Sequence, residues 1–316
     1  MSTRHLVDPE LLPLVDSFPP MILSDETLPA IRAAIPAMMA AQPLPDLPVM
    51  CSEVLVPSGE GDRMIRCLAI RPDSLRAPAP AILNFHGGGH VLGVPEMNRP
   101  QLMRWAAEFG CFILSVDYRL SPETRFPGAI EDCYAALGWL HAEADALGID
   151  PARIAVSGES AGGALAACLC LMARDRGEFP IAFQHLEAPR LDDRASISGD
   201  PNPYTGEFVW TRESSRFCQI AYLGDVPDRD DISPYATAAR ASDLSGLPPA
   251  YIAVGALDLF VDECLDYTER LTRAGVAIEL HIYPGCFHGF KMATGASVSL
   301  RAEEDNIRAL RRALAA

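Results

Sequence analysis

The chain has 316 residues, of which 49% are apolar and 22% are charged, so a mostly disordered chain is excluded. Its formal charge is 26 − 42 = −16, and its pI is near 4.8. Such an acidic surface repels phosphate backbones and anionic lipid, which argues against nucleic acid or a membrane surface as a partner. No run approaches the roughly 18 apolar residues that a membrane-spanning helix requires.

The nine cysteines are an odd number, most lie inside apolar runs, and none forms a C-x-x-C pair. This pattern is typical of reduced, buried thiols in a cytoplasmic protein and not of a disulfide framework or a zinc site. The N-terminal stretch MSTRHLVDPELLPLVD interrupts its apolar positions with Asp, Glu and Pro, so we expect no signal peptide.

The first 48 residues are rich in proline and lack the alternation of a strand. Short helices are predicted at 9–16 and 25–39, the second because its apolar residues recur at steps of three and four. Ser24 precedes the second helix as a candidate N-cap. We expect this segment to be a helical flap that packs on another surface.

From residue 49 onward, short apolar runs alternate with helical patterns. Strand-like runs lie at 49–57, 64–71, 79–86, 111–118, 153–157, 250–255 and 277–283. Helical patterns lie at 99–109, 127–147, 161–174, 261–273 and 302–315. Continuous apolar runs suit parallel strands that are buried on both faces. The alternation therefore predicts an α/β fold with a mostly parallel sheet, helices on both faces and an antiparallel hairpin at one edge.

Residues from about 201 to 224 break this alternation and are rich in aromatic side chains. We expect a helical insertion over the strand ends. Its Phe208, Trp210 and Phe217 could line a substrate pocket, or they could equally form the core of the insertion.

The sharpest motif is Gly158-Glu159-Ser160-Ala161-Gly162-Gly163, which follows one predicted strand and opens a predicted helix. That context is typical of a nucleophile elbow, in which the chain reverses at the serine and exposes its hydroxyl above the sheet. Small residues suit positions 158 and 162 because bulky ones would clash. We therefore predict that Ser160 is a catalytic nucleophile beside a helix N-terminus.

A serine hydroxyl needs a base, which a carboxylate in turn orients. Of the three histidines after Ser160, His185 and His281 lie within strand-like runs, where structural roles are expected. His288 lies in YPGCFHGF, directly after the last strand, and the loops at the carboxyl ends of strands are where such sheets place their sites. His288 is therefore the predicted base.

The predicted acid is Asp258, because the run YIAVGALD ends there. Asp262 and Glu263 are the alternatives, but both fall in the first turn of the next helix, where carboxylates complement the helix dipole.

A second glycine-rich motif, His86-Gly87-Gly88-Gly89, follows the run AILNF. Successive glycines let backbone N–H groups approach a ligand oxygen, as in the oxyanion loops of serine hydrolases. His86 itself is expected to be structural and to fix the loop by hydrogen bonds.

Together these motifs resemble the bacterial hormone-sensitive-lipase-like carboxylesterases (family IV) of the α/β-hydrolase fold. The matching stretches are FHGGGHVLG, DYRLSPE, GESAGG, DLFVDE and YPGCFHGF, in the same order and spacing. The resemblance implies a catalytic domain at 49–316, with a helical cap from residues 1–48 and the insertion at about 201–224. It also implies a Ser160–His288–Asp258 triad and an oxyanion hole formed by the N–H groups of Gly88, Gly89 and Ala161.

The chain departs from the family pattern at Glu159, at Leu259 and at His90, where Asp, Pro and an apolar residue are usual. The triad is unaffected, but His90 places a titratable group near the acyl pocket. Candidate substrate-binding residues are His90, Phe208, Trp210 and Phe287. Cys286 is expected to be a small buried filler, although a redox role so close to the base is an alternative. Arg119 and Glu123 are predicted to form a structural ion pair.

The predicted function is a serine carboxylesterase that hydrolyses small, fairly apolar esters of short to medium chain through an acyl-enzyme, without a metal or cofactor. The same triad would serve an amidase or deacetylase acting on small N-acyl compounds. A non-catalytic ligand-binding relative is a third hypothesis, but such a protein normally lacks a triad member. The resemblance also implies a homodimer.

Overall fold

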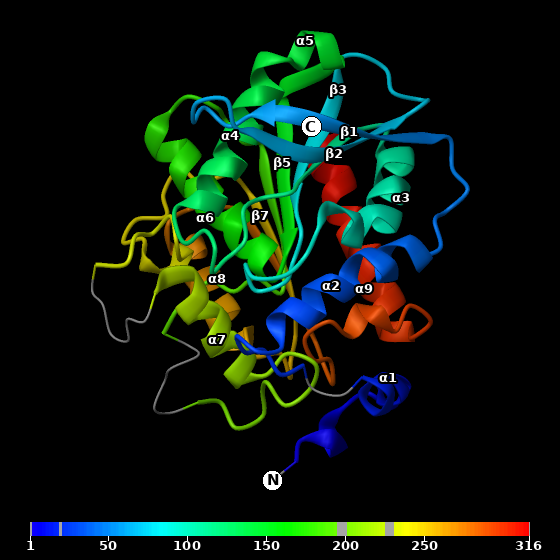
Figure 1. Cartoon of the computed structure of the whole chain (residues 1–316), viewed down its shortest axis with the longest axis vertical. Coiled ribbons are helices and arrows are strands. Elements are labelled where there is room, and N and C mark those ends of the chain that lie inside the picture. Colours follow the sequence, from blue (N-terminus) through cyan, green and yellow to red (C-terminus); the bar gives the residue numbers. More distant parts are fainter. Residues whose placement is uncertain (1, 19–20, 195–200, 225–230, 316) are drawn as a thin grey trace.

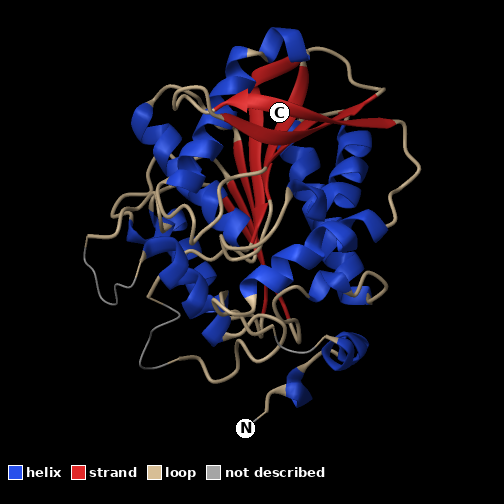
Figure 2. Ribbon diagram, viewed as in Figure 1, coloured by secondary structure: helices blue, strands red, loops and turns tan. Residues whose placement is uncertain are grey.

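The computed structural model describes residues 2–18, 21–194, 201–224 and 231–315. Over these ranges a sheet of eight strands has the order β1-β2-β4-β3-β5-β6-β7-β8 (Figure 2). The strands are β1 (Val49–Pro57), β2 (Met64–Pro72), β3 (Ala79–Phe85), β4 (Phe112–Val116), β5 (Ile149–Glu159), β6 (Phe183–Glu187), β7 (Ala250–Gly255) and β8 (Ile278–Tyr283).

The sheet is antiparallel at one edge, where β1 pairs with β2 and β2 pairs with β4, and parallel elsewhere. The parallel register aligns the carboxyl ends of β5 and β6, since Glu159 pairs with Glu187. It also aligns the ends of β7 and β8, since Gly255 pairs with Tyr283. The loops that follow these strands therefore emerge together at one end of the sheet.

Helices cover both faces of the sheet (Figure 1). On one face lie α4 (Gly128–Ala142), α6 (Ala161–Arg176) and α8 (Val261–Arg273), and on the other lie α3 (Arg99–Phe109) and α9 (Ser297–Leu314). The buried apolar residues form two clusters, one beneath each set of helices. Both faces of the central strands are therefore covered, which explains why β3, β4 and β7 are buried along their whole length.

The N-terminal segment (residues 2–18 and 21–48) crosses the end of the sheet where these loops emerge (Figure 1). It contains α1 (Leu12–Ser17) and α2 (Leu28–Ala41). The N–H of Asp8 donates to the carbonyl of Gly285 at 3.0 Å, and the N–H of Leu23 donates to the Ser214 hydroxyl at 3.4 Å. The segment thus contacts both the loop after β8 and the insertion.

Several predicted elements differ from the observed ones. The second helix begins at Leu28 instead of residue 25, because Ser24 and Thr27 exchange backbone-to-side-chain hydrogen bonds in a turn before it. The helix predicted at 127–147 divides into α4 and the short α5 (Ala144–Leu147). Within the insertion, only α7 (Arg212–Leu223) is helical, and residues 201–211 form turns and bends.

The predicted Arg119–Glu123 ion pair is wrong. Arg119 contacts Asp132 at 2.9 Å and Glu60 at 3.0 Å, whereas Glu123 contacts Arg32 at 2.7 Å. Asp132 lies on α4 with its side chain 1% exposed, so the arginine turns inward to this buried carboxylate. Glu123 instead faces the N-terminal segment.

No helix in the described part of the chain combines the length and the apolar character that crossing a membrane requires.

Candidate active site

Ser160 lies at a sharp turn between β5 and α6, with φ of 57° and ψ of −117°. This backbone conformation is rare for a residue with a side chain, and it is maintained by tight packing. A Cβ on Gly158 would lie 2.2 Å from the carbonyl of Gly162, and one on Gly162 would lie 2.1 Å from the carbonyl oxygen of Phe85. The predicted need for glycine at both positions is therefore confirmed.

Ser160, His288 and Asp258 form a continuous hydrogen-bonded chain. Nε2 of His288 lies 3.0 Å from the Ser160 hydroxyl oxygen, and Nδ1 of the same ring lies 2.8 Å from Oδ2 of Asp258. The other carboxylate oxygen of Asp258 accepts the Phe260 N–H at 2.9 Å. All three side chains are buried, with residue exposures of 5%, 7% and 1%. The structure thus brings together the three residues predicted as a triad.

The electrostatic surroundings of His288 favour its protonated form. Burial alone would lower the pKa of His288, but the Asp258 carboxylate, and more weakly Glu159, raise it above its ordinary value. A carboxylate at Nδ1 also holds the proton there and leaves Nε2 free to accept one from Ser160. This arrangement can deprotonate a hydroxyl and stabilise the imidazolium that results.

The glycine-rich loop after β3 has the conformation that only glycine adopts easily. Gly88 has φ of 116° and Gly89 has φ of 64°. The Gly88 carbonyl accepts N–H groups from Val91 and Leu92 at 3.1 and 2.8 Å, which closes a tight turn. A Cβ on Gly88 would lie 2.3 Å from the carbonyl oxygen of Leu92, so no other residue fits.

His86 anchors this loop, as predicted. Its Nδ1–H donates to the Gly87 carbonyl at 2.8 Å, and its ring stacks on Tyr118 at 4.2 Å between centroids. The Tyr118 hydroxyl donates to the His86 carbonyl at 2.7 Å. Because burial lowers the pKa of His86 to about 4, the ring is neutral and structural.

Of the four predicted substrate-binding residues, Trp210 lies beside the triad. The Trp210 ring is 6.0 Å from the His288 ring between centroids, and a Cβ on Gly89 would lie 2.8 Å from Trp210. Phe208 packs against Phe287 at 5.6 Å between centroids, and Phe287 is fully buried behind the base.

His90 is 1% exposed and stacks on Tyr222 of α7 at 4.1 Å between ring centroids. Burial, aided by Arg190, lowers the pKa of His90 well below its ordinary value. The titratable group that departs from the family pattern is therefore neutral. Its ring joins the glycine-rich loop to the insertion.

The two other histidines after Ser160, and Cys286, have structural surroundings. His185 is fully buried and bonds Ser157 and Asn306 at 3.0 and 3.3 Å, and His281 contacts Glu279 at 2.8 Å. Burial raises the pKa of Cys286 to about 12, which disfavours the reactive thiolate and supports its role as a filler.

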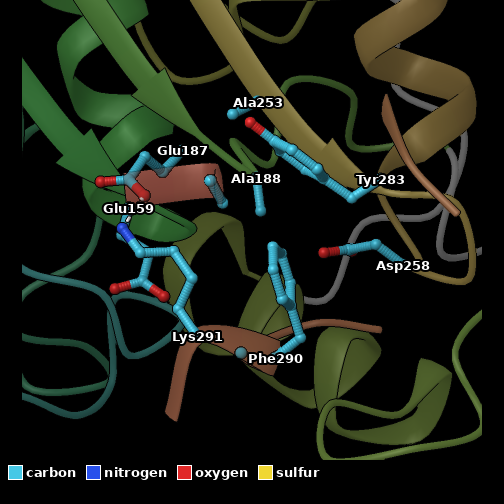
Figure 3. Close-up of a pocket in the computed structure, with 10 residues that line it drawn as sticks. Glu159, Glu187, Ala188, Ala253, Asp258, Tyr283, Phe290 and Lys291 are labelled. Carbon is cyan, nitrogen blue, oxygen red and sulfur yellow. Dashed lines mark hydrogen bonds and ion pairs between the residues drawn. The ribbon is translucent and has the colours of Figure 1, made fainter. Parts of the chain in front are cut away.

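Sequence reasoning missed Phe260, Glu187 and Lys291 around the triad, although it singled out Glu159. Phe260 meets the His288 ring edge to face at 5.1 Å and is 2% exposed. Glu159, Glu187 and Lys291 form a charged layer that borders a cavity of about 20 Å³ together with Asp258 (Figure 3). One available signal was composition, because Lys291 is the only lysine among 26 basic residues.

No group of three or more His, Cys, Asp or Glu side chains within the described ranges is placed to hold a metal ion.

The sheet order and the turn at Ser160 are those of the α/β hydrolases, and comparison with known proteins agrees. A family model described as the alpha/beta hydrolase fold matches residues 82–292. Esterase LipI of Mycobacterium tuberculosis is 34% identical over 287 residues, covering 91% of this chain and 88% of the relative. Carboxylesterase NlhH of the same species is 33% identical over 313 residues, covering 98% and 97%.

The solved structure of a bacterial heroin esterase is 41% identical, covers 99% of each chain and superposes with a TM-score of 0.93. The chain therefore belongs to the hormone-sensitive-lipase-like carboxylesterases of the α/β-hydrolase fold. These relatives favour ester hydrolysis over the amidase and non-catalytic hypotheses.

Proposed function

We propose that this carboxylesterase cleaves small esters through an acyl-enzyme on Ser160. The serine oxygen attacks the ester carbonyl while Nε2 of His288 takes the hydroxyl proton. The alcohol leaves with that proton, and water then hydrolyses the acyl-serine by the same route. Asp258 keeps the imidazole in the required tautomer and stabilises its charged form.

The observation that carries this proposal is the pair of contacts at His288, 3.0 Å to the Ser160 hydroxyl and 2.8 Å to Asp258. Both lie in the range that proton transfer requires. The strained turn at Ser160 supports the same role, because such strain is usually retained at functional positions.

We assign the oxyanion hole to the N–H groups of Gly88, Gly89 and Ala161. Ala161 is the first residue of α6, where N–H groups have no partner within the helix. The loop carrying the two glycines packs on the same turn, since a Cβ on Gly87 would lie 3.6 Å from Cβ of Ser160. Each such donor is typically worth about 3–4 kcal/mol of barrier height.

We assign the cap to residues 1–48 and 201–224 and the catalytic domain to 49–316. The cap crowds the site, because Phe208 and Trp210 are only 9% and 7% exposed and Ser160 is 5% exposed. A site so covered suits short- to medium-chain esters, with Phe208 and Trp210 forming its wall. Phe287 packs against Phe208 and His90 stacks on Tyr222, so we assign these two residues to the support of that wall.

The test is hydrolysis of p-nitrophenyl esters from C2 to C16 by the wild type and by Ser160→Ala. We expect serine-dependent turnover that is greatest at short chains. Full turnover by Ser160→Ala would overturn the mechanism, and a maximum at C12–C16 would overturn the cap-limited pocket. A matched acetanilide and acetate ester should show ester cleavage only.

A cytoplasmic location and a homodimer remain proposals that rest on the cysteine pattern and the family resemblance. The strand β8 is an edge of the sheet and carries Ile282 with 38% exposure, which supports pairing through this edge. Light scattering behind a size-exclusion column would give the mass, and a mass of one chain at assay concentration would contradict the dimer.

A further inference from the structure

The backbone of Glu187 is hydrogen-bonded to the backbone of Ser160. It is the last residue of β6, and its carbonyl oxygen accepts the N–H of Ser160 at 2.8 Å. The same residue pairs with Glu159 in the parallel register. The position of Ser160 is therefore set in part by the end of β6.

The side chain of Glu187 forms an ion pair with the loop that carries His288. Its carboxylate pairs with the ammonium of Lys291, which lies three residues after His288 in the short helix at Phe290–Met292. Asn306 of α9 donates to the same carboxylate oxygen at 2.9 Å. Figure 3 shows the ammonium beside Glu187, at the opposite side of the cavity from Tyr283.

Both members of this pair are charged. Burial alone would lower the pKa of Lys291, but Glu187 and then Glu303 raise it above its ordinary value. Burial would likewise raise the pKa of Glu187, but Lys291 lowers it. The side chains of Lys291 and Glu187 are 25% and 12% exposed, so water screens their attraction less than that of a pair on the open surface.

A second carboxylate orients the ammonium from α9. Glu303 contacts Lys291 at 3.1 Å and accepts N–H groups from Gln101 and Trp105 at 2.9 Å each. Lys291 is also the only lysine among the 26 basic residues of the chain. Since arginine is used at every other basic position, the composition of the chain does not explain a lysine here. Its carboxylate partners come from β6 and α9, and both elements pack beneath the site.

We propose that the Glu187–Lys291 ion pair is a clamp that sets the distance between Ser160 and His288, so that both are positioning residues for the reaction. Glu187 holds the serine by its carbonyl and the histidine loop by its carboxylate. Loss of the clamp lets the loop carrying His288 move relative to the serine, and misplacement by about 1 Å can cost roughly 100-fold in rate. This inference rests on the proposed function.

The test compares Lys291→Met and the double variant Glu187→Gln/Lys291→Met with the wild type on p-nitrophenyl butyrate. The rate is expressed per site titrated with a fluorophosphonate, so that unfolded molecules do not count. We expect both variants to lose about 10- to 100-fold in kcat, with KM changed less than about twofold. Glu304→Gln, an exposed neighbour on α9, is the matched control and should retain the wild-type kcat.

The double variant removes the ion pair without leaving an unpaired charge at position 187, and Glu303 keeps its N–H donors from Gln101 and Trp105. It therefore reduces the charge imbalance that Lys291→Met alone would create. Recovery of wild-type kcat in the double variant would overturn the clamp, as would a change confined to KM. Ser160→Ala is assayed alongside. If it retains activity, the proposed function itself fails, whereas an inactive Ser160→Ala with a fully active double variant removes only the clamp.

Discussion

The guanidinium of Arg32 donates its Nε–H to the carbonyl oxygen of Val91 at 2.7 Å, which ties α2 to the glycine-rich loop. Its Nη2 donates to the Ser121 carbonyl at 2.5 Å, and its Nη1 contacts Glu123 at 2.7 Å. One side chain of the N-terminal segment thus holds three points beyond that segment, two of them backbone carbonyls in or near the glycine-rich loop.

Arg32→Met should therefore loosen the glycine-rich loop, to which we assign the oxyanion hole. We expect a loss of about 2 kcal/mol in the free energy of unfolding, since hydrogen bonds to charged groups contribute roughly 1.5–3 kcal/mol. We also expect a fall of about 10-fold in kcat/KM because the N–H groups of the loop are less well placed. Urea denaturation and ester kinetics measure the two effects.

Arg4→Met is the control, because Arg4 pairs with Asp16 at side-chain exposures of 45% and 63%. Such surface pairs contribute about 0–1 kcal/mol. Equal behaviour of the two variants would contradict the role assigned to Arg32.

Glu159→Gln should shift the pH dependence of the enzyme. Glu159 is among the groups that raise the pKa of His288, so its neutralisation lowers that pKa. Because the base must be unprotonated, the acidic limb of kcat/KM should move to lower pH, which a pH–rate profile reports. Glu143→Gln makes the same charge change on the surface and should leave the limb in place. A shift of Glu159→Gln to higher pH would contradict this account.

Asp132→Ala should be strongly destabilising. Asp132 is 1% exposed and receives Arg63 at 2.5 Å and Arg119 at 2.9 Å. Removal of the carboxylate leaves Arg63 and Arg119 with only the half-exposed Glu60 as an acidic partner. Loss of the buried partner of an ion pair typically costs about 3–5 kcal/mol, and with Glu60 still in place we expect the lower end of that range. Glu269→Ala breaks an exposed pair with Arg273 and should cost less than about 1 kcal/mol. If Asp132→Ala and Glu269→Ala lowered the denaturant midpoint by the same amount, the ion pairs of Asp132 would not stabilise the fold as argued.

Gly162→Ala should disrupt the turn at the nucleophile, because its Cβ would lie 2.1 Å from the Phe85 carbonyl oxygen and 2.6 Å from that of His86. Relief of this clash must move the serine or the oxyanion loop, so we expect activity to fall by about 100-fold or more. Gly295→Ala adds a methyl group where nothing lies within 4 Å. It should behave as the wild type in a kinetic assay, and an active Gly162→Ala would contradict the packing argument.

Local patterns predicted the elements that carry their own signal. The runs at 49–57 and 250–255 coincide with β1 and β7, and the helical pattern at 261–273 coincides with α8. These segments are bounded by turn residues and have a clear apolar period, so neighbouring sequence decides their structure. The residues predicted as a triad also lie together, because the carboxyl ends of parallel strands meet at one edge.

Contacts between distant charged residues could not be predicted in the same way. Arg119 could pair with several carboxylates, and only the placement of α4 beside its loop selects Asp132 over Glu123. The Glu187–Lys291 pair likewise joins residues 104 positions apart. Charge pairing depends on three-dimensional placement and leaves no periodic pattern in the sequence.

Mass spectrometry after reaction with a fluorophosphonate tests whether Ser160 is the nucleophile that His288 activates. We expect one adduct per chain, located on the peptide that contains Ser160. We expect no adduct in Ser160→Ala and a much slower reaction in His288→Ala. An adduct on another residue, or unchanged labelling of Ser160→Ala, would show that Ser160 is not the activated nucleophile.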